Sequence, residues 1–200
     1  SDTVRAYDLD AAAYAANGAT MPESVRRDIE AFAELLGAGA RVLEIGSGGG
    51  RDARLMEELG LRVRRTDITP GFVALLRAEG HDADVLDPLT DDLSSPDGAY
   101  AAVWANASLL HVARADLPVV LANLAVVSAD GALLRISVKE GDGEDWSTHG
   151  SITHPRHFTY WRADALRDVV AGAGWRDVEI VHQPGTKNAE SWLEVSAVRA

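Results

Sequence analysis

A glycine-rich stretch is the part of this sequence whose residue types and spacing could bind a nucleotide-like ligand. Gly46 and the glycines at 48–50 follow directly after the mostly apolar residues 42–45. Glycine allows the backbone to approach a ligand closely, and the N-terminus of a following helix offers free N–H groups to an anion. The sequence therefore predicts a strand, a glycine bend and a helix that together hold a nucleotide. The alternative is an ordinary strand–helix turn without a ligand.

The spacing of these glycines excludes two common nucleotide fingerprints. A dinucleotide fingerprint needs glycine where Arg51 stands, and a phosphate-binding loop needs a Gly-Lys-Ser/Thr run that is absent. What remains is Glu44-x-Gly46-x-Gly48. This pattern resembles the first motif of the class I S-adenosylmethionine-dependent methyltransferases, in which the bend cradles the amino-acid part of the cofactor.

The resemblance implies which residues bind the cofactor. Asp67 stands 23 residues after Glu44, close to the spacing at which a carboxylate meets ribose hydroxyls. Asp87, after the next strand, is expected at the adenine, with Asp84 as the alternative. The full predicted set for S-adenosylmethionine, or its product S-adenosylhomocysteine, is Glu44, Gly46, Ser47, Gly48, Asp67, Ile68, Asp87, Ala105 and Asn106.

Two residues are candidates for catalysis. His111 follows the strand that ends at Ala105, and an imidazole titrates near neutrality, so it could act as a general base. Its alternative is a helix-start histidine that packs beneath the cofactor. Tyr14 could cover the active site, because an N-terminal aromatic often does so in the family. A surface or core tyrosine is the competing interpretation.

A polar, glycine-rich segment at 139–161 is expected to be a lid or acceptor-binding loop, because long loops in compact domains usually bind ligands. His157, Tyr160 and Trp161 are its predicted acceptor-binding residues. The histidines at 149, 154 and 157 and the aspartates between 82 and 92 could suggest a metal. Their spacing is poor for one, so no metal site is predicted.

These residues must be positioned by an α/β fold. Residues 1–39 read as a helical entry, with a helix at 22–36, and residues 40–200 read as the cofactor-binding core of a single domain. Strands are predicted near 41–45, 61–67, 81–87, 99–105, 132–138, 175–182 and 192–198, with helices between most of them. The resemblance implies a Rossmann-like three-layer sandwich with a mostly parallel seven-stranded sheet in the order 3-2-1-4-5-7-6, whose seventh strand is antiparallel.

Composition limits the function further. The 200 residues carry a net charge of −12 and no cysteine, so disulfides, a thiolate nucleophile and a cysteine-based zinc site are excluded. The acidic balance disfavours nucleic acid as a partner. No apolar run is long enough for a membrane span and the first residues do not read as a signal peptide, so we expect a cytoplasmic protein.

We therefore predict an S-adenosylmethionine-dependent methyltransferase that acts on an O or N nucleophile of a small molecule or small peptide. The alternatives are a non-catalytic cofactor-binding or partner module and, with less support, a nucleic-acid methyltransferase. The sequence leaves the acceptor and the oligomeric state open.

Overall fold

The computed structural model describes residues 1–148, 152–185 and 190–200. The chain divides into two compact units. The first unit comprises residues 1–87 and 148–156, and the second comprises residues 88–147 and 157–200.

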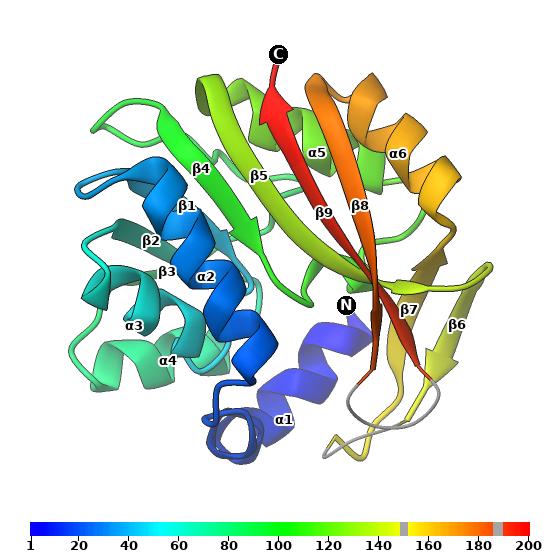
Figure 1. Ribbon diagram of the computed structural model, residues 1–200. Helices are drawn as coiled ribbons and strands as arrows, with labels where there is room; N and C mark the ends of the chain where they lie inside the picture. Colours follow the sequence, from blue (N-terminus) through cyan, green and yellow to red (C-terminus); the bar gives the residue numbers. More distant parts are fainter. Residues whose placement is uncertain (149–151, 186–189) are drawn as a thin grey trace. The chain divides into compact units, whose positions relative to one another are not determined.

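The first unit is built on a parallel sheet in the order β3-β2-β1, drawn in blue and cyan in Figure 1. Its elements in chain order are α1 (Asp2–Asn17), α2 (Glu23–Leu36), β1 (Arg41–Ile45), α3 (Arg51–Glu58), β2 (Arg62–Asp67), α4 (Pro70–Ala78) and β3 (Ala83–Val85). The helix and strand positions predicted for this part of the chain are confirmed. Helix α1 begins directly after Ser1, which caps it by accepting a hydrogen bond from the Val4 amide.

Strand β2 shows how an arginine-rich segment becomes an inner strand. Arg65 is buried and makes a bidentate pair with Glu57, with both N–O distances at 2.7 Å. Arg64 pairs with Asp84 of the neighbouring strand at 2.9 Å. Charge-assisted bonds of this kind compensate the positive charges, so the strand can lie between its neighbours, although Nε of Arg65 is buried without a hydrogen-bond partner.

The second unit contains the rest of the sheet strands and two α-helices. Its elements are β4 (Tyr100–Ala105), the short 3-10 helix η1 (Leu109–His111), α5 (Leu117–Val126), β5 (Ser128–Glu140), β6 (Glu144–Ser147), β7 (Arg156–Trp161, whose first residue belongs to the first unit), α6 (Ala163–Gly172), β8 (Trp175–Pro184) and β9 (Ser191–Arg199). Strands β4 and β5 are parallel, and β9 runs antiparallel to both β5 and β8. Figure 1 shows β5, β9 and β8 side by side. Each unit thus reproduces its half of the predicted strand order, including the antiparallel final strand.

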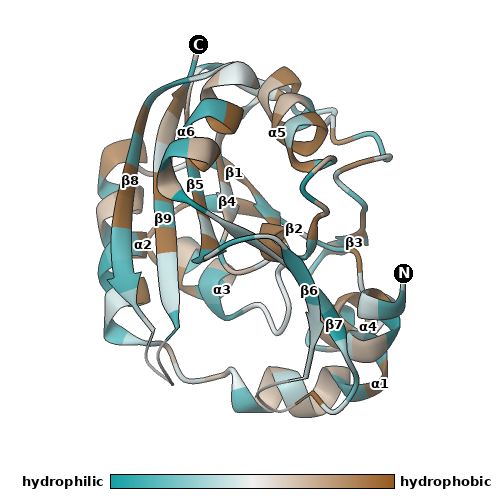
Figure 2. Ribbon diagram, turned by 90° about the vertical axis from the view of Figure 1, so that its right-hand side faces the viewer, coloured by the Kyte–Doolittle hydropathy of each residue, from teal (hydrophilic) through white to brown (hydrophobic). Residues whose placement is uncertain are grey.

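The segment 139–161 differs from the prediction of a loop, because it contains strands β6 and β7. Strand β7 pairs in parallel with the end of β5, with Lys139 opposite Tyr160. Aromatic and β-branched residues favour strands, and the turn before β6 uses Gly143 at φ 74°. In Figure 2 both strands are coloured mainly in the hydrophilic range. The predicted acceptor residues of this segment therefore lie on a strand.

Helix α5 is the most apolar helix, and Figure 2 colours it largely in the hydrophobic range. Its inner residues Leu117, Val120, Leu121 and Leu124 are all fully buried. Across the described ranges of the chain, no helix combines the length and apolar character that a membrane crossing would need.

Candidate active site

The glycine bend after β1 adopts backbone conformations that side chains resist. Gly46, Gly48 and Gly50 have φ of 78°, 51° and 73°. The amides of Gly46 and Ser47 both donate to the carbonyl of Thr66 at 2.9 Å, which fixes the bend to the end of β2. A left-handed backbone favours glycine, so the bend requires glycine at these positions of the motif.

The two faces of the bend have different surroundings. A Cβ built on Gly48 would meet no atom within 4 Å, whereas one built on Gly49 would lie 3.0 Å from Ala15 Cβ of α1. Arg51 reaches the same region and donates to the carbonyl of Gly18 at 3.3 Å. Helix α1 thus packs against one side of the bend, and Gly48 leaves space for a ligand on another.

Glu44 is the buried acid of the motif, with 2% of its surface exposed. Ser47 Oγ donates a short hydrogen bond to its Oε2, and the Thr66 amide donates to Ser47 Oγ at 3.1 Å. Burial raises the pKa of Glu44 to about 8, with a further contribution from the charge of Asp52. The group can therefore change its charge when a cationic ligand approaches it.

Asp67 lies at the end of β2 and is bound by the backbone on both oxygens. The Gly48 amide donates to Oδ2 at 2.9 Å and the Thr69 amide donates to Oδ1 at 2.8 Å. Burial raises the pKa of Asp67, and these two amides lower it in part. Each carboxylate oxygen keeps a further lone pair, so the fixed side chain can still accept from hydroxyl groups. In the structure these residues form two hydrogen-bonded pairs at the bend, Glu44 with Ser47 and Gly48 with Asp67. We call the four residues, which are predicted to bind the cofactor, the cofactor cradle.

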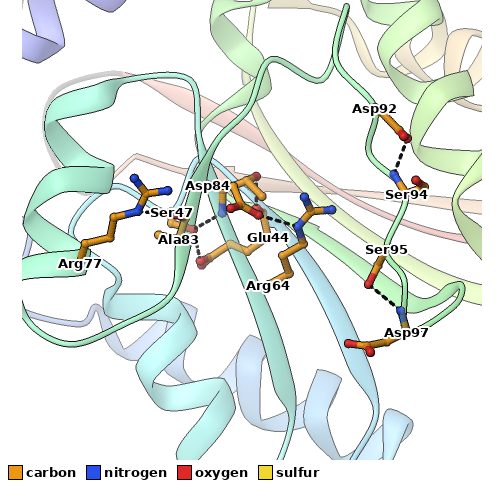
Figure 3. Close-up of polar contacts among 11 residues, drawn as sticks. Glu44, Ser47, Arg64, Arg77, Ala83, Asp84, Asp92, Ser94, Ser95 and Asp97 are labelled. Carbon is orange, nitrogen blue, oxygen red and sulfur yellow. Dashed lines mark hydrogen bonds and ion pairs between the residues drawn. The ribbon is translucent and has the colours of Figure 1, made fainter.

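The two candidate adenine-binding aspartates differ. Figure 3 shows Asp84 directed at Arg64, and the 2.9 Å ion pair occupies one of its oxygens. Asp87 follows β3 beyond Leu86, whose amide donates to the Asp67 carbonyl at 3.0 Å. Strand pairing therefore keeps Asp87 near the end of β2, and Asp87 remains the candidate for adenine binding.

Ile68, also predicted at the cofactor, is 40% exposed beside Asp67, which suits contact with a ligand.

Tyr14 belongs to an aromatic cluster with Tyr7 and Phe72. The rings of Tyr7 and Tyr14 meet edge to face at 5.2 Å, and Phe72 lies 5.7 Å from Tyr14. Arg156 donates to the Tyr7 hydroxyl at 2.9 Å. Burial and the neighbouring Tyr14 raise the pKa of Tyr7, so its phenol stays protonated. Tyr14 is the tyrosine that the sequence predicts near the site. Tyr7 is not predicted, because its partner Arg156 is far away in the chain.

Asn106 is held at the end of β4 in the second unit. Ser137 Oγ donates to Asn106 Oδ1 at 2.7 Å and accepts from the Ala107 amide at 2.8 Å. Ala107 has φ of 52°, an uncommon value for a residue with a side chain. Ala105 is fully buried. Ser137 therefore holds the Oδ1 side of the Asn106 amide. It is a neighbour of this predicted cofactor-binding residue that the sequence did not reveal.

Each of the two histidines His111 and His157 places a ring nitrogen near the backbone carbonyl of the other. His111 Nδ1 lies 2.6 Å from the His157 carbonyl oxygen, and His157 Nδ1 lies 3.4 Å from the His111 carbonyl oxygen. A carbonyl only accepts, so Nδ1 of His111 carries the hydrogen and Nε2 carries the lone pair of the neutral ring. Glu144 Oε2 lies 3.6 Å from His157 Nε2. In this arrangement the atom of the neutral His111 ring that can accept a proton is Nε2.

The other predicted acceptor residues have different surroundings. Trp161 is 2% exposed, and the guanidinium of Arg114 lies 4.0 Å from its ring centroid. Arg114 also donates to the Tyr160 carbonyl. Tyr160 is partly exposed on the opposite side of β7 from Trp161, as strand alternation requires. His149 lies outside the described residues, and no cluster of three or more metal-ligating side chains occurs in the part of the chain that the structure describes.

Lys139 and Phe158 complete a polar and aromatic group in the second unit. The Lys139 ammonium lies 4.6 Å from the Phe158 ring centroid, and the His111 ring lies 4.7 Å from the same centroid. We call His111, Lys139, Glu144, His157 and Phe158 the His111–Lys139 cluster. A lysine in a polar segment is usually a surface residue, so no feature of the sequence marks Lys139 as buried.

Comparison with known proteins identifies the chain. The family model described as "Methyltransferase domain" matches residues 18–180. The chain belongs to this methyltransferase family. The resemblance inferred from the Glu44–Gly48 motif is thereby confirmed. No curated protein matches the sequence.

Solved structures share the fold. A Burkholderia thailandensis 1,6-didemethyltoxoflavin N1-methyltransferase, solved with 1,6-didemethyltoxoflavin and S-adenosylhomocysteine, matches with TM-score 0.73 and 21% identity over 98% of this chain and 88% of that one. The N-methyltransferase NodS from Bradyrhizobium japonicum, solved with S-adenosylhomocysteine, matches with TM-score 0.63 and 15% identity over 87% and 85%. The cyclase SpnF matches with TM-score 0.70 and 18% identity over 98% and 94%. These likenesses confirm the predicted Rossmann-like α/β fold class.

Proposed function

We propose that this methyltransferase-family chain binds S-adenosylmethionine and transfers its methyl group to an O or N nucleophile of a small molecule or small peptide. The observation that carries the proposal is the cofactor cradle: a left-handed glycine bend with open space at Gly48, a buried acid at Glu44 and a fixed carboxylate at Asp67. The structures of fold relatives with S-adenosylhomocysteine support the choice of cofactor.

The residues present fit this cofactor. Glu44, with Gly46, Ser47 and Gly48, would hold its amino-acid part, because a buried carboxylate suits an ammonium group. Asp67 would accept from the ribose hydroxyls, Asp87 would bind the adenine amino group, and Ile68 would contact the nucleoside. Ala105 and Asn106 would flank the sulfonium.

When bound, the cofactor supplies an electrophilic methyl group on a good leaving group. The chain then has to orient the acceptor, exclude water and remove a proton. His111 is the proposed base, and it takes the acceptor proton at Nε2 because Nδ1 is already committed to the His157 carbonyl. Tyr14 would cover the site, and His157 and Tyr160 would contact the acceptor. Trp161 was also predicted to do so, but it is 2% exposed on the opposite side of β7 from Tyr160, so it would support the strand instead. Holding the reacting atoms about 3–3.5 Å apart in a dry site accounts for much of the acceleration such enzymes achieve.

Two measurements test this function. Calorimetry with S-adenosylhomocysteine should show binding, and transfer of labelled methyl from S-adenosylmethionine into host small-molecule and peptide pools should be lost in His111→Gln by about a hundredfold or more. The His111→Gln variant should still bind S-adenosylhomocysteine. If the protein binds the cofactor but labels no pool, it is a non-catalytic cofactor-binding module. Salt-dependent RNA binding would instead favour a nucleic-acid methyltransferase.

A further inference from the structure

Lys139 is a buried cation near the carboxyl end of β5. It is 4% exposed, and its Nζ lies 2.9 Å from Glu190 Oε1. The ring centroids of Phe158 and Trp192 lie 4.6 Å and 5.7 Å from the same nitrogen. Burial of an ammonium group is costly unless a carboxylate and polarisable neighbours compensate it, so this environment is built around a positive charge and one anion.

The two partners of this ion pair are held differently. Lys139 lies on a strand that is paired on both sides, with Tyr160 of β7 and Trp192 of β9 as its register partners. Glu190 lies just before β9, outside any strand, and a third of its side chain is exposed. The cation is therefore held by a paired strand, while the carboxylate lies outside the strands and is partly exposed to solvent.

The ring of Phe158 connects this cation to the proposed base. Both the Lys139 ammonium and the His111 ring lie close to it, at 4.6 Å and 4.7 Å from its centroid. The cation and the proposed base are therefore neighbours of the same ring, so a small acceptor that carries both an anionic group and a nucleophile would meet both.

We propose that Lys139 determines acceptor specificity by binding the carboxylate of a planar aromatic acceptor, and that Glu190 takes the place of this carboxylate when the acceptor is absent. This inference rests on the proposed methyl-transfer function, because it names the class of acceptor for that reaction. The net charge of −12 repels anions at long range, so selection of an acid needs a local, built-in cation such as this one.

The test compares acids with their amides on the full chain. Benzoate, para-hydroxybenzoate and salicylate are titrated beside benzamide, para-hydroxybenzamide and salicylamide, with S-adenosylhomocysteine present and binding followed by tryptophan fluorescence and calorimetry. The variants are Lys139→Met and Glu190→Gln. Asp142→Asn, which removes the carboxylate of an exposed ion pair with Arg162, is the matched control.

The two variants should change the acid-to-amide preference in opposite directions. Lys139→Met should lower it by about tenfold, because the charge-assisted contact is lost. Glu190→Gln should raise it by about threefold, because the competing carboxylate is gone. Asp142→Asn should leave it unchanged. If Lys139→Met does not fold, the direction in which Glu190→Gln changes the acid-to-amide preference still decides whether the proposal holds.

Two results would overturn the proposal. One is a native protein that binds none of the acids better than its amide. The other is a Glu190→Gln variant whose acid preference falls or stays the same, as expected if the ion pair only stabilises the fold. Binding of S-adenosylhomocysteine, measured separately, reports on the proposed function, so its loss is distinguishable from failure of acid recognition.

Discussion

The cofactor cradle of the first unit and the His111–Lys139 cluster of the second unit are constructed in different ways. The cradle is made largely by the backbone: amides of Gly46, Ser47 and Gly48 donate to Thr66 and Asp67. The cluster is made by side chains on η1, β5, β6 and β7 that meet through ring contacts, a histidine–glutamate contact and a histidine–carbonyl bond. A backbone-built site restricts residue types locally, whereas a side-chain-built site can vary its residues with the ligand. We infer that the cradle serves the shared cofactor and the cluster serves the particular acceptor.

The largest expected effect comes from adding one methyl group to the cradle. Gly48→Ala places a Cβ in the open space where the cofactor is proposed to lie, and the affinity for S-adenosylhomocysteine should fall about a hundredfold. Calorimetry measures this change.

The matched control for Gly48→Ala is Gly37→Ala. Gly37 has φ of 77°, and a Cβ there would also meet nothing within 4 Å, but it caps α2 away from the bend. Both substitutions should cost about 1 kcal/mol of stability or more, because both place alanine at a positive φ that favours glycine. Equal cofactor affinity in the two variants would contradict a cradle at Gly48.

The second prediction concerns the pH dependence of the free energy of unfolding. The pKa of Glu44 is raised from 4.5 to about 8 in the folded protein, so the folded state holds a proton that the unfolded state has lost between these values. Stability contributed by this proton is present at low pH and disappears as pH rises through this window, by about 1.4 kcal/mol per pH unit. Glu44→Gln should remove that slope from the free energy of unfolding in urea, measured between about pH 5.5 and about pH 7.5, which lies between the two pKa values.

Glu58→Gln is the control for this slope, since Glu58 is an exposed glutamate at the end of α3. It should unfold with the same pH dependence as the unchanged protein. A Glu44→Gln variant that retains the full slope would show that Glu44 does not titrate as its burial demands.

The smallest effect is expected in the second unit, at Ser137. Ser137→Ala removes the bonds to Asn106 and Ala107 and should cost about 1–2 kcal/mol of stability. Affinity for S-adenosylhomocysteine should fall about threefold, because Asn106 is no longer held. Ser128→Ala, on the same strand, loses the hydrogen bond to the Leu124 carbonyl and should destabilise the fold without affecting cofactor affinity. Identical cofactor affinities for the two variants would remove Asn106 from the proposed site.

The sequence predicted the cradle better than the cluster for a physical reason. Glu44, Gly46 and Gly48 lie within one turn of chain, and Asp67 follows at the end of the next strand, so both local conformation and strand alternation mark them. The segment 139–161 was expected to be a loop because its glycines and charges outweigh its strand-forming aromatics. The pairing of β7 with β5 is a non-local contact, and residue pattern alone does not reveal it.

What the sequence by itself determined is the alternation of strands and helices and the position of the glycine bend, because backbone propensities and left-handed conformations act over a few residues. The antiparallel last strand was expected only from the family resemblance. Only the tertiary structure decided that Arg156 joins Tyr7, that the His157 carbonyl fixes the proton of His111, and that Lys139 is buried beside Glu190. These contacts join residues 46 to 149 positions apart. The energy of these contacts depends on burial and on distance in space, and neither quantity can be read from the order of the residues.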